Sequence, residues 1–141
     1  GMDVRLACPE GYAPHPAVLE FAKTVTDAAF TLTRSPEEAA RDADVIFTDV
    51  WASMGQEKEA EERRRAFEGY QVNDRVMSLA KPDCMVQHCL PAHRGEEITA
   101  EVFEAHAQEI FDEAENRLHV QKAVMFLLMG GDEEALFGKK A

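Results

Sequence analysis

Short apolar runs that alternate with helical segments are the feature that most narrows the possible folds of this chain of 141 residues. Continuous apolar runs are typical of strands in a parallel sheet that is covered on both faces. Strands that alternate with helices in turn predict a doubly wound, Rossmann-like α/β fold with a parallel sheet flanked by helices. The expected strands are Val4–Cys8, Phe30–Thr33, Val45–Val50, Met85–Leu90 and a brief fifth strand at Ile110–Phe111.

Capping residues and helical spacing mark the first helices between these strands. Ser35, Pro36 and Glu38 combine an N-cap, a proline at the first helical position and a capping-box glutamate. Pro16 can begin an earlier helix, whose apolar residues are expected to form one buried face. These residues are Val18, Ala22, Val25 and Ala29.

Charge pairs and further caps predict the later helices. Two Glu–Arg pairs stand four residues apart in the favourable order, which predicts a solvated helix within Gln56–Phe67. These pairs are Glu59 with Arg63 and Glu61 with Arg65. The other expected helices are a short one capped by Asn73, one capped by Thr99 over Ala100–His106, and a terminal one over Leu118–Leu128.

The length of the chain fits one domain that buries a real core. We expect this domain to span residues 1–130. The tail Gly131–Ala141 is expected to be a frayed end, although Leu136–Phe137 could dock on the domain.

Charge and hydropathy disfavour several kinds of partner. The 27 acidic and 15 basic residues give a formal net charge of -12, which opposes binding to nucleic acid or to an anionic membrane surface. The apolar run Ala123–Met129 is far shorter than the roughly 20 residues that a membrane-spanning helix needs. No secretory signal is visible, and the cysteines lack C-x-x-C spacing, so we expect a cytoplasmic protein.

Polar residues gather directly after three of the expected strands. Ser53-Met54-Gly55 follows the strand at 45–50, His88-Cys89-Leu90-Pro91 closes the strand that begins at Met85, and Glu115-Asn116-Arg117 follows Ile110–Phe111. Ligands of open α/β sheets bind outside the carboxyl ends of the strands. The three clusters are therefore expected to converge on one site.

The order, spacing and strand-end context of these clusters resemble the ornithine-binding domain of ornithine carbamoyltransferases, through S-M-G at 53–55, H-C-L-P at 88–91 and E-N-R at 115–117. The similarity extends from Asp3 to about Gly130. It implies transfer of the carbamoyl group of carbamoyl phosphate to L-ornithine, which gives L-citrulline and phosphate in arginine biosynthesis or catabolism. It implies no cofactor and no metal.

The resemblance also implies which residues bind the substrate. Asp49 and Ser53 would bind the α-ammonium group of ornithine, and the backbone amide of Met54 would bind its carboxylate. The carbonyl of Leu90 would accept a hydrogen bond from the side-chain amine.

Two residues would have catalytic roles by the same resemblance. Cys89 would lie beside the side-chain amine and orient it, and Arg117 would stabilise the oxyanion that develops on the carbamoyl oxygen. Most of the catalysis would come from proximity and electrostatic stabilisation.

The family pattern is incomplete in this sequence. Neither the S-x-R-T-R loop that binds carbamoyl phosphate nor the G-D-x-N-N segment at the start of the second domain occurs. We therefore expect a carboxy-terminal fragment that is inactive alone, binds ornithine weakly and needs the carbamoyl phosphate domain as a partner. The absent central strand would leave unpaired edges at 4–8 and 45–50, and the terminal helix would lack its cover, so self-association into a homo-oligomer is expected.

Simple packing could account for several of the cysteines and histidines. Cys8 and Cys84 are expected to be packing residues, and His88 a core histidine satisfied by a backbone carbonyl. The spacing of His88, Cys89 and His93 resembles a zinc site, but no second ligand pair lies nearby, so no metal is expected.

Trp51 and Arg117 could likewise have purely structural roles. Trp51 could merely cover its loop, and Arg117 could form a surface ion pair with Glu113 or Glu115.

Other functions fit parts of the same pattern. A sibling carbamoyltransferase could act on aspartate, putrescine or an acylated ornithine, although Ser53-Met54-Gly55 and Cys89 favour ornithine. A non-catalytic module, either decayed or regulatory, could assemble with a separate amino-terminal half. A nucleotide-binding Rossmann domain is disfavoured because no G-x-G-x-x-G turn follows any expected strand.

Overall fold

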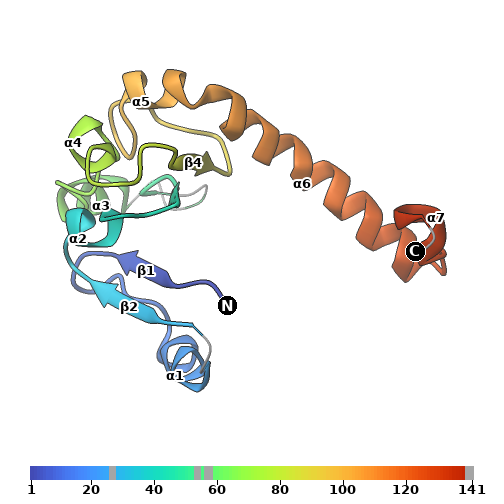
Figure 1. Ribbon diagram of the computed structural model, residues 1–141. Helices are drawn as coiled ribbons and strands as arrows, with labels where there is room; N and C mark the ends of the chain where they lie inside the picture. The colour runs from blue at the N-terminus through green and yellow to red at the C-terminus, as the bar shows by residue number, and fades with distance from the viewer. Residues whose placement is uncertain (26–27, 53–54, 56–58, 139–141) are drawn as a thin grey trace.

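The computed structural model describes residues 1–25, 28–52, 55 and 59–138. Its strands pair in parallel, with β1 (Val4–Ala7) beside β2 (Phe30–Thr33) and β3 (Val45–Thr48) beside β4 (Met85–His88). Helices separate the strands along the chain, as Figure 1 shows. The expected α/β class with parallel strands is therefore confirmed.

The two strand pairs do not form one continuous sheet within the described residues. They form a two-stranded sheet of β1 and β2 and another of β3 and β4. In the first sheet Val4 lies opposite Phe30, and in the second Val45 lies opposite Met85. In Figure 1 the β1–β2 pair lies on the side of α1 (Pro16–Thr24), and β4 lies on the side of α5 (Ala100–Ala105) and α6 (Ala107–Leu128).

Side-chain caps begin several of the helices at the expected residues. Ser35 Oγ accepts a hydrogen bond from Glu38 N at 3.1 Å, Asn73 Oδ1 from Val76 N at 3.1 Å, and Thr99 Oγ1 from Val102 N at 3.3 Å. These caps satisfy amides that have no partner inside their helix. The helices are α1 (Pro16–Thr24), α2 (Pro36–Ala40), α3 (Ala60–Ala66), α4 (Asp74–Met77), α5 (Ala100–Ala105), α6 (Ala107–Leu128) and α7 (Glu133–Phe137).

The expected fifth strand at Ile110–Phe111 is wrong, because both residues lie in α6. Ile110 N donates to His106 O at 3.1 Å, as in a regular helical turn. Ile110 is fully buried while Phe111 is 53% exposed. A helix that packs on β4 buries Ile110 without needing a sheet edge, so a two-residue apolar pattern could not distinguish the two structures.

The expected buried face of the first helix is also wrong. α1 contains no buried residue, and Val18 remains 53% exposed. The helix ends at Thr24, so Val25 is its C-cap and Ala29 lies beyond it. Helical spacing predicted the helix correctly, but the narrow β1–β2 sheet leaves its apolar side uncovered.

The strands are not covered on both faces as their apolar runs predicted. Phe47 in β3 is 68% exposed and Met85 in β4 is 44% exposed, whereas Val86 is fully buried. Successive side chains of a strand point to opposite faces of the sheet. The β3–β4 sheet therefore buries one face, that of Ile46 and Val86, and exposes the other.

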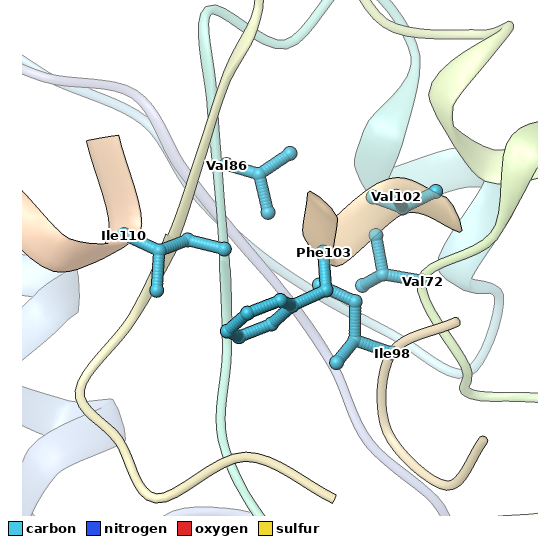
Figure 2. Packing of buried hydrophobic residues seen from close by; sticks show 6 residues of the cluster. All are labelled: Val72, Val86, Ile98, Val102, Phe103 and Ile110. Atoms are coloured by element: carbon cyan, nitrogen blue, oxygen red, sulfur yellow. The ribbon is translucent and has the colours of Figure 1, made fainter. Parts of the chain in front are cut away.

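The hydrophobic core lies between β4, α5 and the first turn of α6. Figure 2 shows its side chains converging from these elements and from the loops around Val72 and Ile98. Ile46, Met77, Leu90 and Ala92 pack against it from the edge. The core thus anchors the loop that follows β4. Its buried members are Val72, Val86, Ile98, Val102, Phe103 and Ile110.

The carboxy-terminal part of α6 leaves this core and carries α7 away from the rest of the chain (Figure 1). Leu128 at the end of α6 is 83% exposed. The tail is not simply frayed, because α7 is capped by Asp132, which accepts a hydrogen bond from Glu134 N at 3.0 Å. In the described residues, no helix combines the length and the apolar character needed to cross a membrane.

Candidate active site

The carboxyl ends of β3 and β4 bring Asp49 and Cys89 together. Thr48 and His88 are opposite each other in the parallel register, so the residues that follow them leave the sheet at the same edge. The Cys89 thiol donates a hydrogen bond to Asp49 Oδ1 at 3.3 Å. The ends of these two expected strands therefore converge at one point.

The surroundings of Cys89 keep its thiol protonated. Burial raises the pKa of the Cys89 thiol, and the hydrogen bond to Asp49 and the charges of Asp49 and Glu113 raise it further. A reactive cysteine needs a lowered pKa, because the thiolate is the nucleophile. Cys89 is therefore suited to hydrogen bonding and not to covalent attack.

Asp49 and Cys89 form a corner at the carboxyl ends of β3 and β4, and the Asp49 carboxylate is exposed there. Its Oδ1 also accepts the hydrogen bond of Val50 N at 2.7 Å, and the residue as a whole is exposed. An exposed carboxylate that already accepts hydrogen bonds from a backbone amide and a thiol can bind a cation while it keeps both of these bonds. Asp49 is thus placed to attract an ammonium group.

Leu90 adopts an unusual backbone conformation beside this pair. Its φ is 55°, in the left-handed region that a branched residue seldom enters, and a cis peptide bond joins it to Pro91. Leu90 N donates to His88 Nδ1 at 3.0 Å, and the side chain packs against the core. The hydrogen bond thus holds the Cys89–Leu90 peptide, and packing holds the Leu90 side chain, so the residue that bears the Leu90 carbonyl is anchored on both counts.

A buried histidine and a buried glutamate support the loop from below. His88 and Glu97 are both fully buried, and His88 Nε2 lies 3.0 Å from Glu97 Oε1. Because Nδ1 accepts from Leu90 N, the proton is on Nε2 and is donated to Glu97. The core position expected for His88 is correct, but its partners are an amide and a carboxylate instead of a backbone carbonyl.

Sequence reasoning missed Glu97. Glutamate is seldom fully buried unless it is paired, and nothing in the local pattern marks this one as internal. The only available signal was its place immediately before the apolar Ile98, which is itself fully buried. Desolvation favours a raised pKa for Glu97, but hydrogen bonds from His88 and from the His93 amide outweigh it and hold the pKa below its usual value.

Arg117 does not contact the Asp49–Cys89 pair. It lies exposed on α6, and its side chain makes no hydrogen bond or ion pair with the described part of the chain. Glu115, one of its two alternative partners, instead contacts His119 at 3.3 Å. The other, Glu113, has one buried carboxylate oxygen without a partner among the described residues.

Ser53 and Met54, the remaining expected substrate-binding residues, lie outside the described residues. Trp51, just before them, packs in an aromatic cluster and stacks on Phe67 with ring centroids 6.1 Å apart. This contact agrees with a covering role for Trp51. A hollow of about 450 Å³ lies beside Trp51, Arg64 and Gln71, but Asp49 and Cys89 do not line it.

Two groups of potential metal ligands occur among the described residues, Asp49 with His88 and Cys89, and His93 with Glu96 and Glu97. In the first, both ring nitrogens of His88 already have partners. A metal there would have to displace the bond that holds Leu90 or the bond to Glu97. In the second, Glu96 is bound to Arg64 at 3.0 Å and Glu97 is fully buried. Neither group is poised to bind an ion.

Cys8 and Cys84 are buried and unpaired, as expected for packing residues. Burial raises the pKa of both thiols. Neither lies at the corner formed by Asp49 and Cys89 within the described contacts, so Cys89 is the thiol that belongs to the site.

Comparison with known proteins places this arrangement in a family. Residues 1–128 match the family model described as "Aspartate/ornithine carbamoyltransferase, Asp/Orn binding domain". The ornithine carbamoyltransferase of Geobacter sulfurreducens is 58% identical over 129 residues, which is 92% of this chain and 43% of that protein. The chain thus spans less than half of the length of that relative.

Solved structures agree with this match. An ornithine carbamoyltransferase from Pyrococcus furiosus superimposes with a TM-score of 0.82 at 52% identity, over 94% of this chain and 44% of that one. The anabolic enzyme from Campylobacter jejuni gives a TM-score of 0.85 at 42% identity, over 89% and 43%. The chain therefore belongs to the aspartate/ornithine carbamoyltransferase family and corresponds to the Asp/Orn binding domain of its members.

Proposed function

We propose that these residues bind L-ornithine and present its side-chain amine for carbamoylation in an ornithine carbamoyltransferase of arginine metabolism. The amine would attack the carbonyl carbon of carbamoyl phosphate, a C–N bond would form, the C–O bond to phosphate would break, and the amine would lose a proton. The observation that carries the proposal is the 3.3 Å contact of Cys89 with Asp49 at the joint carboxyl ends of β3 and β4. The family of the chain and its S-M-G and H-C-L-P motifs support ornithine as the amine.

In this proposal Asp49, Ser53 and the backbone of Met54 hold the amino-acid end of ornithine. Cys89 and the Leu90 carbonyl orient the side-chain amine. The raised pKa of Cys89 supports this role, because a neutral thiol can exchange hydrogen bonds with an amine and does not compete with it as a nucleophile. The fixed backbone of Leu90 supports a carbonyl that is oriented before the substrate arrives.

Arg117 is proposed to stabilise the developing oxyanion. The charge of Glu113 raises the pKa of the Cys89 thiol. This effect supports an orientation in which the face of α6 that carries Glu113 is turned toward the site. Arg117 follows Glu113 by one turn on the same face, about 6 Å further along the axis. Its exposed guanidinium could therefore reach a second substrate that is bound next to Asp49 and Cys89. The proposed role of Arg117 does not require a contact between Arg117 and Cys89.

We further propose that the 141 residues bind ornithine but do not complete the reaction alone. The relatives have more than twice the matched length, and the carbamoyl phosphate loop of the family has no counterpart in the sequence. A domain that binds carbamoyl phosphate would be the necessary partner. The three free cysteines support a reducing, cytoplasmic setting.

The described strands form two separate pairs, β1–β2 and β3–β4. This division supports the proposal that one further strand would lie between β1 and β3 and join the pairs into one doubly wound sheet. Self-association of the 141 residues would cover such edges and the exposed apolar side of α6, where Val120, Val124 and Met125 are 60%, 48% and 56% exposed. Light scattering after size-exclusion chromatography should show an oligomer at micromolar concentration. A monomer would contradict this part of the proposal.

Calorimetric titration with L-ornithine tests the binding role. Asp49→Asn should weaken binding about tenfold or more, because a charge-assisted hydrogen bond is lost. Asp112→Asn is the matched control, since Asp112 is an exposed carboxylate that accepts a hydrogen bond from Gln108 on its own helix. Binding of aspartate or putrescine in preference to ornithine would favour a sibling enzyme.

A mixing experiment tests the catalytic role. The part of the Geobacter sulfurreducens relative that this chain does not match would be added with carbamoyl phosphate and ornithine, and citrulline would be measured. Citrulline should form with the mixture and not with either part alone. If the two parts bind each other and assemble correctly but form no citrulline, the result would instead favour a non-catalytic module.

A further inference from the structure

Glu97 ties together both ends of the loop that carries Cys89 and Leu90. Its Oε1 accepts hydrogen bonds from His88 Nε2 at 3.0 Å and from His93 N at 2.6 Å. These two donors are at the first and last positions of the segment 88–93. One carboxylate oxygen therefore closes the segment into a fixed loop.

The same network sets the backbone of Leu90. A histidine held at Nε2 by Glu97 is left with an unprotonated Nδ1, and this nitrogen accepts from Leu90 N at 3.0 Å. That bond holds Leu90 at its φ of 55°, where an ordinary residue would relax to a negative φ. The chain of contacts runs from Glu97 through His88 to the amide of the Cys89–Leu90 peptide, which directly precedes the peptide that bears the Leu90 carbonyl.

We propose that Glu97 is a positioning residue that acts through His88 to fix Cys89 and the Leu90 carbonyl in the orientation that receives the substrate amine. The inference rests on the proposed function for its substrate. It adds a role to a residue outside the S-M-G, H-C-L-P and E-N-R motifs.

The cost of burying Glu97 argues that its charge has a purpose beyond packing. Val86 and Ile98 are apolar and fully buried in the same core region, and a carboxylate in such surroundings is stabilising only through its hydrogen bonds. An apolar residue would fill the same space at lower cost but would release His88 and His93. The carboxylate is needed to orient the loop and not to fill the core.

His88 is unsuited to act as the base of the reaction itself. Both ring nitrogens have partners inside the fold, and neither partner is Cys89. His88 therefore transmits orientation from Glu97 to Leu90. Cys89 is oriented because it lies between two anchored residues and faces Asp49.

The first test uses the unaltered chain. Two-bond proton–nitrogen NMR spectra should show His88 protonated at Nε2, and hydrogen exchange should show a protected Leu90 amide. A His88 protonated at Nδ1, or a Leu90 amide that exchanges as fast as an open loop, would overturn the proposal. This measurement needs neither a substrate nor a variant.

The second test compares Glu97→Ala, Glu97→Gln and the neighbouring control Glu96→Ala. Glu97→Ala removes both hydrogen bonds of the carboxylate, so it should speed exchange of the Leu90 amide about tenfold or more and weaken ornithine binding about tenfold or more. Glu97→Gln should restore much of both, because its amide oxygen can still accept both bonds. Glu96→Ala should change neither, since the Glu96 carboxylate contacts Arg64 and the exposed ring of His93 and does not accept from the His93 amide that Glu97 holds.

These experiments test the positioning role of Glu97 separately from the proposed binding of ornithine. If Glu97→Ala leaves the His88 protonation state and the Leu90 amide unchanged, Glu97 has no positioning role. If the unaltered chain binds no ornithine, the substrate assignment fails while the NMR comparison still tests Glu97. If Glu97→Ala does not fold, the unaltered chain and Glu97→Gln decide the question.

Discussion

The Cys89 thiol donates a hydrogen bond to the Asp49 carboxylate at 3.3 Å although the two residues are 40 positions apart in the chain. Parallel pairing of β3 with β4 makes this contact possible, because both residues leave the sheet at its carboxyl edge. The contact also determines the chemistry of Cys89, since a neighbouring carboxylate disfavours the thiolate.

Replacing Asp49 should make Cys89 more reactive. The charge of Asp49 and its hydrogen bond both raise the pKa of the thiol, and Asp49→Asn removes the charge and weakens the acceptor. The thiolate fraction at neutral pH, and with it the rate of alkylation, should therefore increase. Iodoacetamide labelling followed by peptide mass spectrometry measures the rate at Cys89. The peptides with Cys8 and Cys84 are internal references, and a slower rate at Cys89 would contradict the role of Asp49.

Ile110 should contribute far more stability than Leu118 on the same helix. Ile110 is fully buried in the core and Leu118 is 53% exposed. Ile110→Ala should lower the free energy of unfolding by about 2–5 kcal/mol, whereas Leu118→Ala should cost less than about 1 kcal/mol. Urea denaturation followed by circular dichroism gives both values. Equal losses would show that the first turn of α6 does not pack as described.

The N-cap of α5 should be a separable source of stability. Thr99 Oγ1 accepts from Val102 N at 3.3 Å, and Val102 belongs to the core. Thr99→Ala should lower the free energy of unfolding by about 0.5–2 kcal/mol, because that amide loses its partner. Thr99→Ser retains the hydroxyl and should cost clearly less. The comparison fails if the serine and alanine variants unfold at the same urea concentration.

Acid should destabilise the fold partly through Glu97. Its pKa is lower in the folded state than in the unfolded chain, so its contribution is present above the unfolded value of about 4.3 and is lost as pH falls through the folded pKa. Glu97→Gln cannot titrate and should show a shallower loss of stability below about pH 4.3. Thermal unfolding from about pH 7 to about pH 3 measures both proteins. Parallel curves would mean that the pKa of Glu97 is not lowered in the fold.

The sequence was sufficient where structure depends on nearby atoms. The caps formed by Ser35, Asn73 and Thr99 join atoms three residues apart, and all three are present. The ion pairs of Glu59 with Arg63 and of Glu61 with Arg65 also formed, at 3.3 and 3.1 Å. The motifs at 53–55, 88–91 and 115–117 were sufficient to indicate the family.

Patterns of apolar residues were less reliable, because they do not show what packs against them. Helical spacing predicted α1 but not the exposure of Val18, and an apolar run predicted β3 but not the exposure of Phe47. The pair Ile110–Phe111 is too short to distinguish a strand from a helical turn. Arg117, expected to point into the same site as Cys89, is exposed on α6, and its role stays a prediction.

The sequence by itself determined the four strands that the structure contains, the capped starts of three helices, the family and the identity of Asp49 and Cys89 as neighbours at a strand edge. Only the tertiary structure decided that His88 and Glu97 are buried together, that Leu90 is held at a positive φ and that α6 continues through Ile110. The physical reason is the separation along the chain of the groups that interact. Caps and helical ion pairs join residues within about one helical turn of each other. Burial and the orientation of a loop depend on distant segments that the local pattern does not contain.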